Sequence, residues 1–254
     1  VDTETVTATV NSTFNSSNVE TATTVTVNGL SLSDGTNGGL ASNYSLSTGQ
    51  LASASITPKE LVVTGLSAAD RFYNGSNEIS LTGDAALSGF IGSETVTISN
   101  GTATTGRLSN PNAGAQSVAT SISLSDGDEG GLAGNYSVLQ PSVSNVIIAK
   151  KILTGTVTAN NKVYDGSTVA IGTTLDVEGF VDTETVTATV NASTFNNSDV
   201  GTATTVTVNG FTIADGTNGG LASNYNLPNG LTASAFVTPK ELTATATAYD
   251  KVYD

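Results

Sequence analysis

Apolar and polar residues alternate along much of the chain with a period of two, which is typical of β-strands and not of helices. In residues 183–190, valines and an alanine fall on one face and threonines on the other. Residues 202–214 repeat the pattern, and Gly210 within them predicts a bulge or bend. Shorter stretches nearby also predict strands, at 153–159, 173–180, 224–227 and 231–237.

Residues that favour turns separate these predicted strands. They include YDGS at 164–167, ADGTNGG at 214–220 and LPNG at 227–230. Roughly six or seven short strands in about 90 residues, with turns between them, are typical of an antiparallel β-sandwich. The sequence therefore predicts an all-β, immunoglobulin-like fold.

The pattern itself repeats along the chain. The segment VDTETVTATV at 1–10 recurs letter for letter at 181–190, and IGSETVTISN at 91–100 stands between the two copies. The spacing indicates modules of about 90 residues, long enough for each to form a core. We expect complete modules at 58–149 and 150–238, the C-terminal part of a module at 1–57, and the start of a further module at 239–254. The chain then reads as a portion of a longer array.

The predicted module boundaries carry a short recurrent segment. TPKEL at 57–61 returns at 238–242, and AKKIL at 149–153 is the middle copy. Pro239 cannot donate a backbone hydrogen bond and favours an extended Thr238. A linker of about two or three residues predicts that the modules form an elongated rod.

Charge and composition exclude several classes of function. The net charge is −14, from 22 acidic and 8 basic residues, which argues against partners such as nucleic acid and anionic membranes. No apolar run is long enough for a transmembrane helix. The absence of Cys and His removes thiolate chemistry and the usual general base, so we expect no enzyme activity.

A tyrosine turn marks each module. It reads DRFYNGS at 70–76, NKVYDGS at 161–167 and DKVYD at 250–254. Asp165 can accept a hydrogen bond from the backbone two residues on, and Gly166 suits a positive φ. Asparagine makes the same turn without the charge, which favours a structural role over a catalytic or metal-binding one. The predicted structural turn motif comprises Tyr73, Asn74, Gly75, Tyr164, Asp165, Gly166, Tyr253 and Asp254.

A second tyrosine follows each glycine-rich loop, in the NY pairs that include Tyr44, Tyr136 and Tyr225. We interpret these tyrosines as structural plugs, with a hydroxyl that bonds back to the loop. Asp182 and Glu184 lie two residues apart and resemble a catalytic carboxylate pair, but Gly92 stands where Asp182 would be in the preceding copy. A solvated strand edge is the favoured interpretation.

The acidic loops raise the question of a cation. SDGDEGG at 125–131 places Asp126, Asp128 and Glu129 among glycines, a composition that suits Ca²⁺. The related loops at 33–39 and 214–220 keep one carboxylate each, and none follows a known calcium motif. A turn capped by aspartate is the alternative. We expect no cofactor and leave Ca²⁺ at this loop open.

The KVYDG turn, the TPKEL junction, the DTETVT strand and the NY loop together resemble the YDG-type, or MBG-like, tandem modules of large bacterial surface and secreted proteins. Filamentous-haemagglutinin-like adhesins are among those proteins. The resemblance covers essentially the whole chain and implies a non-enzymatic, extracellular stalk or fibre at the bacterial cell surface. Its implied partners are neighbouring modules, with lateral self-association into fibres.

One alternative function belongs to a different class. Threonine at every second strand position gives a regular hydroxylated face, and weak glycan or surface binding by each repeat would be strengthened by multivalency. Ca²⁺ could stiffen such modules. Ordinary strand exteriors explain the same threonines, and we favour that explanation.

Overall fold

The computed structural model describes residues 3–99 and 101–254 and confirms the all-β prediction. In this part of the chain the only helices are single turns of 3₁₀ helix, η1 (Ala41–Asn43), η2 (Ala133–Asn135) and η3 (Ala222–Asn224). None of these described helices has the length and apolar character needed to cross a membrane. The chain divides into two compact units, the first from residues 1–69, 78–109 and 117–144, the second from residues 70–77, 110–116 and 145–254.

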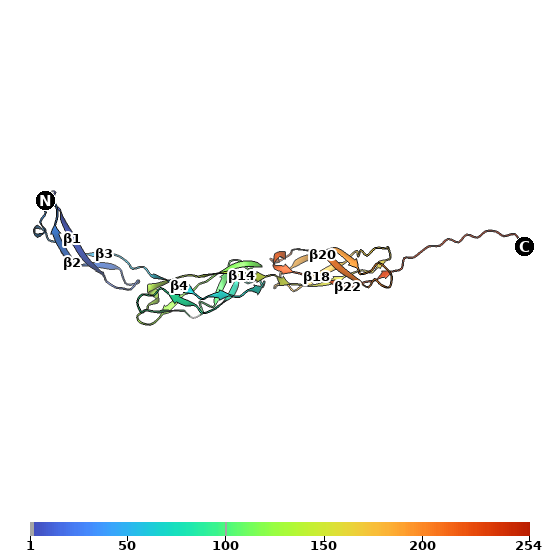
Figure 1. Cartoon of the computed structure of the whole chain (residues 1–254), viewed down its shortest axis with the longest axis horizontal. Coiled ribbons are helices and arrows are strands. Elements are labelled where there is room, and N and C mark those ends of the chain that lie inside the picture. The colour runs from blue at the N-terminus through green and yellow to red at the C-terminus, as the bar shows by residue number, and fades with distance from the viewer. Residues whose placement is uncertain (1–2, 100) are drawn as a thin grey trace. The chain divides into compact units, whose positions relative to one another are not determined.

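The first unit begins with a three-stranded antiparallel sheet of β1 (Val6–Phe14), β2 (Thr24–Asp34) and β3 (Leu51–Ser53), with β2 in the centre (Figure 1). The pairing of β1 with β2 shifts register between Asn11 and Ser12, as a β-bulge does. Most side chains of β1 are exposed.

The rest of the first unit surrounds a small apolar core. β4 (Lys59–Thr64) pairs in antiparallel fashion with β8 (Ala86–Ser88) and in parallel with β13 (Tyr136–Leu139). Leu61, Val96 and Tyr136 form the buried centre. The remaining strands of this part are β5 (Ser67–Ala68), β7 (Glu78–Thr82), β9 (Val96–Ile98), β10 (Thr105–Leu108) and β12 (Leu124–Asp126), and β11 (Gly114–Ala119) has residues in both units.

The second unit is built on the pairing of β19 (Val186–Phe195), β20 (Thr205–Asp215) and β22 (Thr232–Ser234), with β16 (Thr154–Thr158) paired to β18 (Thr174–Glu178) (Figure 1). The register of β19 against β20 is irregular opposite Gly210, as the sequence predicts. The core cluster is made of small and medium side chains and one ring: Ala170, Phe195, Ala203, Val206, Ala235 and Val237.

The second unit also contains parallel pairs, which the sequence does not predict. β15 (Lys151–Ile152) pairs with β21 (Tyr225–Asn226), and β17 (Lys162–Val163) pairs with β23 (Val237–Thr238). β6 (Arg71–Phe72) pairs with the end of β14 (Ser142–Ala149). In each case a strand from the start of a repeat lies beside a strand from its end, and short strands of this kind leave no alternating pattern long enough to recognise.

Candidate functional site at the repeat junction

The tyrosine turns have the local geometry of Asx turns. The side-chain oxygen of Asn74 accepts the N–H of Ser76 at 3.1 Å, and Asp165 accepts the N–H of Ser167 at 2.9 Å. Gly75 and Gly166 both have φ of +78°, a conformation that L side chains adopt only with strain. The turns therefore differ in charge and share one backbone path.

A basic side chain contacts each turn. Lys162 donates to the Asp165 carboxylate at 2.8 Å and to the carbonyl of Ser167 at 2.6 Å. The hydrogen bond from Lys162 lowers the pKa of Asp165. Arg71 donates to the Asn74 side chain and to the Ser76 carbonyl in the same manner. In the last copy, Lys251 lies 2.8 Å from Asp254, and Tyr253 is exposed.

Tyr73 extends from its turn into a buried contact with residues of the following repeat. Its hydroxyl donates to Oε1 of Glu184 at 2.6 Å, and the hydroxyl of Tyr225 donates to Oε2 of the same carboxylate at 2.6 Å. The two rings meet edge to face, with centroids 5.7 Å apart and an interplanar angle of 83°. By sequence Tyr73 belongs to the repeat 58–149, and all three residues lie in the second compact unit.

Burial acts strongly on these phenols. Desolvation, followed by the hydrogen bond to Glu184, raises the pKa of Tyr225 to about 12. The same two causes raise the pKa of Tyr73. Tyr225 also accepts the backbone N–H of Val181 at 3.0 Å, so its hydroxyl both donates and accepts. Both tyrosines stay neutral, and Glu184 is held as their common acceptor.

The pairing of the NY tyrosine with a glutamate recurs. Tyr136 donates to Glu94 at 2.7 Å and accepts the N–H of Ile91, and Tyr44 donates to Glu4 at 2.8 Å. Interpreting Glu184 as part of a solvated strand edge is therefore wrong, because the residue precedes β19 and accepts two tyrosine hydroxyls. A glutamate that precedes the NY tyrosine by 40, 42 and 41 residues in the three copies is the signal in the sequence that could have revealed this pair.

Sequence reasoning also missed an asparagine contact beside these tyrosines. Asn224, which is fully buried, accepts the N–H of Ala113 at 2.9 Å and donates from Nδ2 to Oδ1 of Asn112 at 3.0 Å. In the first unit Asn135 makes the corresponding contacts, accepting the N–H of Val19 at 2.9 Å and donating to Asn18 at 3.1 Å. Asn135 and Asn224, the asparagines of two NY pairs, therefore each form hydrogen bonds with a loop of the preceding repeat.

The acidic loops use their aspartates as backbone acceptors. Asp126 accepts the N–H of Ala133 at 2.7 Å, and Asp34 and Asp215 make the same contact with the first residues of η1 and η3. Throughout residues 3–99 and 101–254, no three acidic residues lie close enough to hold a metal ion. The structure therefore does not bring Asp126, Asp128 and Glu129 together as a cation site.

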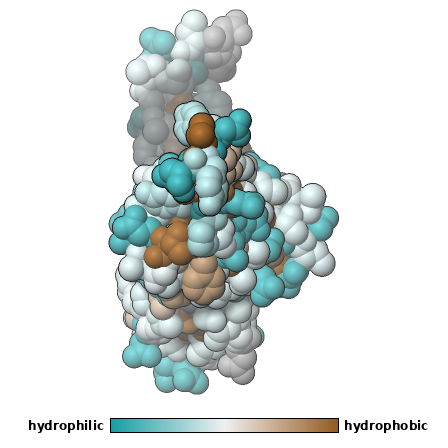
Figure 2. All heavy atoms as spheres, turned by 90° about the vertical axis from the view of Figure 1, so that its right-hand side faces the viewer, coloured by the Kyte–Doolittle hydropathy of each residue, from teal (hydrophilic) through white to brown (hydrophobic). Residues whose placement is uncertain are grey.

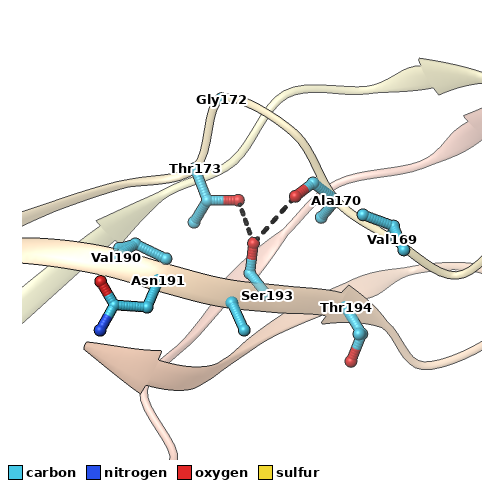
Figure 3. A pocket seen from close by; sticks show the side chains of 9 residues that line it. Val169, Ala170, Gly172, Thr173, Val190, Asn191, Ser193 and Thr194 are labelled. Atoms are coloured by element: carbon cyan, nitrogen blue, oxygen red, sulfur yellow. Dashed lines mark hydrogen bonds between the residues drawn. The ribbon is translucent and has the colours of Figure 1, made fainter.

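A shallow pocket lies where β19 is irregular, and Figure 3 shows its lining side chains. The hydroxyl of Ser193 donates to the Ala170 carbonyl at 3.1 Å and bonds to the Thr173 hydroxyl at 2.8 Å. The remaining lining residues are Val169, Gly172, Val190, Asn191, Ala192 and Thr194. Both hydrogen bonds of the Ser193 hydroxyl join β19 to the segment 170–173, so we interpret this pocket as a packing contact.

The recurring turns, the paired strands and the repeated tyrosine and asparagine contacts define a protein built of tandem all-β repeats. The chain belongs to the YDG domain family. The model of that family matches residues 57–144 and again residues 149–234, which together make up more than half of the chain. No curated protein and no solved structure matches it.

Proposed function

We propose that this chain is a non-enzymatic, extracellular structural array that forms the stalk or fibre of a bacterial surface adhesin or filament. The observation that carries the proposal is the contact of Tyr73 with Glu184 and Tyr225. Modules joined by flexible linkers do not need buried hydrogen bonds between residues of successive repeats, whereas a stiff array does. Lateral self-association of such arrays would give fibres.

The chemistry of the surface supports the same proposal. Among the described residues no three acidic side chains lie close enough to hold a metal ion, and Asp126 and Glu94 accept hydrogen bonds within the fold. The resemblance to modules of bacterial exoproteins supports placement outside the cell. A highly acidic surface also keeps a long, repetitive chain soluble.

Small-angle X-ray scattering of the full chain tests the proposal. We expect the scattering of a rod for the natural chain and a more flexible, bent ensemble for a Glu184→Ala variant, because that substitution removes the shared acceptor. A Glu4→Ala variant, measured as a control, should give the same scattering curve as the natural chain. A compact particle, or equal flexibility in both variants, would count against a stiff array.

One observation favours a second candidate, multivalent weak binding of a glycan or another surface. The threonines that alternate along β19 and β1 are exposed, including Thr187, Thr189, Thr7 and Thr9. Binding of the full chain on a glycan array, lost when Thr187 and Thr189 become valine, would support this function. The isosteric valines keep the strand propensity, so a loss would report on the hydroxyls.

A further inference from the structure

Asn74 stands where the turn of the following repeat has Asp165, and the two turns share one backbone path. Gly75 and Gly166 have the same φ of +78°. In both turns the side-chain oxygen accepts the N–H of the serine two residues on. The turn can therefore hold an aspartate at position 74 without a change of the backbone.

The basic side chains of the two turns have different acceptors. Lys162 forms an ion pair with the carboxylate of Asp165 at 2.8 Å. The buried Nε of Arg71 has no hydrogen-bond partner within the described residues. The guanidinium of Arg71 donates to three uncharged oxygens, those of Phe72, Asn74 and Ser76. A carboxylate in place of the amide would give this cation a stronger, charge-assisted hydrogen bond.

The same contacts act on the amide of Asn74. Its Oδ1 accepts from the Arg71 guanidinium, and it accepts the N–H of Ser76 at 3.1 Å. Attack of a nucleophile on Cγ puts negative charge on this oxygen, and donors fixed in place stabilise such a charge. The chain itself supplies a nucleophile, the backbone nitrogen of Gly75, which has no side chain to hinder its approach. Asn74 and Gly75 are exposed, so water reaches the turn.

Five other described asparagines precede a glycine, and their side chains are held differently. In four of them the amide nitrogen donates to an oxygen elsewhere in the chain, and these are Asn28, Asn37, Asn209 and Asn218. Asn74 is held through its oxygen, and its nitrogen is the group that leaves when the amide is attacked. The fifth, Asn229, is exposed in the turn before Gly230 and serves as a comparison.

We propose that Asn74 is a modification site at which the chain converts its own asparagine to aspartate. The Gly75 nitrogen bonds to Cγ of Asn74, the Cγ–Nδ2 bond breaks, and ammonia leaves with the proton of the Gly75 N–H. The cyclic imide that remains is opened by a water molecule at Cγ. The hydroxyl stays on Cγ as the new carboxyl group, and a proton returns to the Gly75 nitrogen.

The surroundings of Cγ favour aspartate over the alternative product. Water that adds at the main-chain carbonyl of Asn74 gives isoaspartate, which lengthens the main chain within the turn. Water that adds at Cγ builds negative charge on the oxygen that accepts from Arg71 and Ser76, which stabilise it. The aspartate then pairs with Arg71 as Asp165 pairs with Lys162. The backbone path of the turn is kept.

The surface of the protein is compatible with the additional charge. Figure 2 shows a face on which neutral and hydrophilic residues predominate and hydrophobic residues form separate patches. The side chain of Asn74 is exposed, and the chain already carries a net charge of −14. A carboxylate at this position is hydrated on its open side and neutralised by Arg71 on the other.

Peptide mass mapping of the freshly purified full chain, before and after incubation at mildly alkaline pH, tests the proposal. Asn229 is the internal control, because it is exposed and also precedes a glycine. In the folded chain we expect aspartate to form at position 74 about tenfold faster than at position 229. In urea, which removes the contacts of the turn, the two rates should become nearly equal. A folded chain that converts Asn74 no faster than Asn229, or gives mainly isoaspartate there, overturns the proposal.

Substitutions of Arg71 separate the effect of the cation from that of the turn. Arg71→Gln should slow the conversion of Asn74 about tenfold and leave the rate at Asn229 unchanged. Arg71→Lys supplies the side chain that Lys162 provides in the other turn and should keep most of the rate. Circular dichroism shows whether each variant is folded, and the comparison of folded and urea-unfolded natural chain needs no variant. A folded Arg71→Gln chain that converts Asn74 at the natural rate contradicts the role of the cation.

The Asn74→Asp variant reproduces the product. At low salt it should melt at a higher temperature than the natural chain, and the difference should shrink at high salt because salt screens the ion pair. The matched Asp165→Asn variant, which removes the ion pair with Lys162, should melt at a lower temperature than the natural chain. An Asn74→Asp variant that melts below the natural chain at low salt overturns the ion pair with Arg71 and the proposal with it.

This conversion is independent of the proposed function, and the two fail differently. A chain that scatters as a rod but keeps Asn74 unchanged overturns the conversion and leaves the stalk intact. A chain that scatters as a compact particle overturns the stalk, whatever residue is found at position 74.

Discussion

The rings of Tyr73 and Tyr225 lie edge to face and donate their hydroxyls to opposite oxygens of one carboxylate, that of Glu184. One tyrosine comes from a turn and the other from the NY pair of the next repeat. The carboxylate therefore ties together two motifs that the sequence presents as separate landmarks. Charge-assisted hydrogen bonds of this kind are about twice as strong as neutral ones, which makes Glu184 the first residue to test.

Replacing Glu184 with alanine should lower the free energy of unfolding of the second unit by about 3 kcal/mol, because two buried hydroxyls lose their acceptor. Urea denaturation measures the change. The matched Glu4→Ala variant removes an exposed Tyr44 contact and should lower the free energy of unfolding much less. Equal losses in the two variants would mean that the hydrogen bond from Tyr73 adds nothing to the pair that Glu184 forms with Tyr225.

Replacing Tyr73 with alanine should destabilise the second unit by about 3 kcal/mol, through a lost buried ring and an unfilled cavity. The same change at Tyr164 removes an exposed ring and should alter the free energy of unfolding by less than about 1 kcal/mol in dilute solution. Thermal unfolding followed by circular dichroism compares the two. A large loss of stability at Tyr164 with a small loss at Tyr73 would contradict the stabilising role of the buried Tyr73 ring.

Replacing Asn224 with alanine should cost about 2 kcal/mol, since the N–H of Ala113 loses its acceptor and the side chain of Asn112 loses its donor. Asn135 is half-buried, so the equivalent change there should cost less. Denaturant midpoints of both variants give the ranking. If Asn135→Ala proves the more damaging, the burial of Asn224 does not control the contact.

Replacing Gly166 with alanine should cost about 1 kcal/mol, because alanine at φ of +78° is strained. Gly75 has the same φ, but a Cβ there would also lie 3.0 Å from Cγ1 of Val181, while open space surrounds Gly166. Gly75→Ala should therefore be the more destabilising of the two. Identical melting temperatures would show that the turn at 75 does not pack against Val181.

Alkaline pH should weaken the second unit. The pKa of Tyr225 is raised to about 12 in the folded state and that of Tyr73 is also raised, whereas an unfolded tyrosine titrates near its ordinary value of about 10. The unfolded chain therefore loses protons first. Stability from these phenols is complete below about pH 10 and is lost as the pH rises through the folded pKa.

Melting temperatures measured from about pH 8 to about pH 12 check this expectation. The Tyr225→Phe variant, which has one less phenol to ionise, should start lower and decline less steeply. A natural chain whose melting temperature stays constant across this range would contradict the assigned environment of Tyr225.

Local pattern and turn chemistry were enough to predict much of the fold. Alternation in 183–190 and 202–214 predicts β19 and β20, and Gly210 predicts the irregular register between them. These features depend on neighbours in sequence, through side-chain period and backbone preference. The repeat spacing further predicts tandem modules, and the two matches to the YDG domain family confirm a tandem repeat.

The junction depends on contacts that no local pattern encodes. The hydrogen bond between Tyr73 and Glu184 joins a turn of one repeat to a residue of the next repeat. Only the fold determines which loops of the two repeats meet. A glutamate recurs at positions 4, 94 and 184, whereas Asp182 has a glycine at the equivalent position 92. The parallel pairs were missed because two-residue strands such as β17 carry no periodic signal.

The parallel pairing of β17 with β23, and of β15 with β21, has a mechanical consequence. A force that pulls the two ends of the repeat in opposite directions slides these strands along each other. Their hydrogen bonds are then loaded in shear and must break together, not one after another as in an unzipping hairpin. A repeat closed in this way resists extension under tension, even though its core is built mostly of small aliphatic side chains.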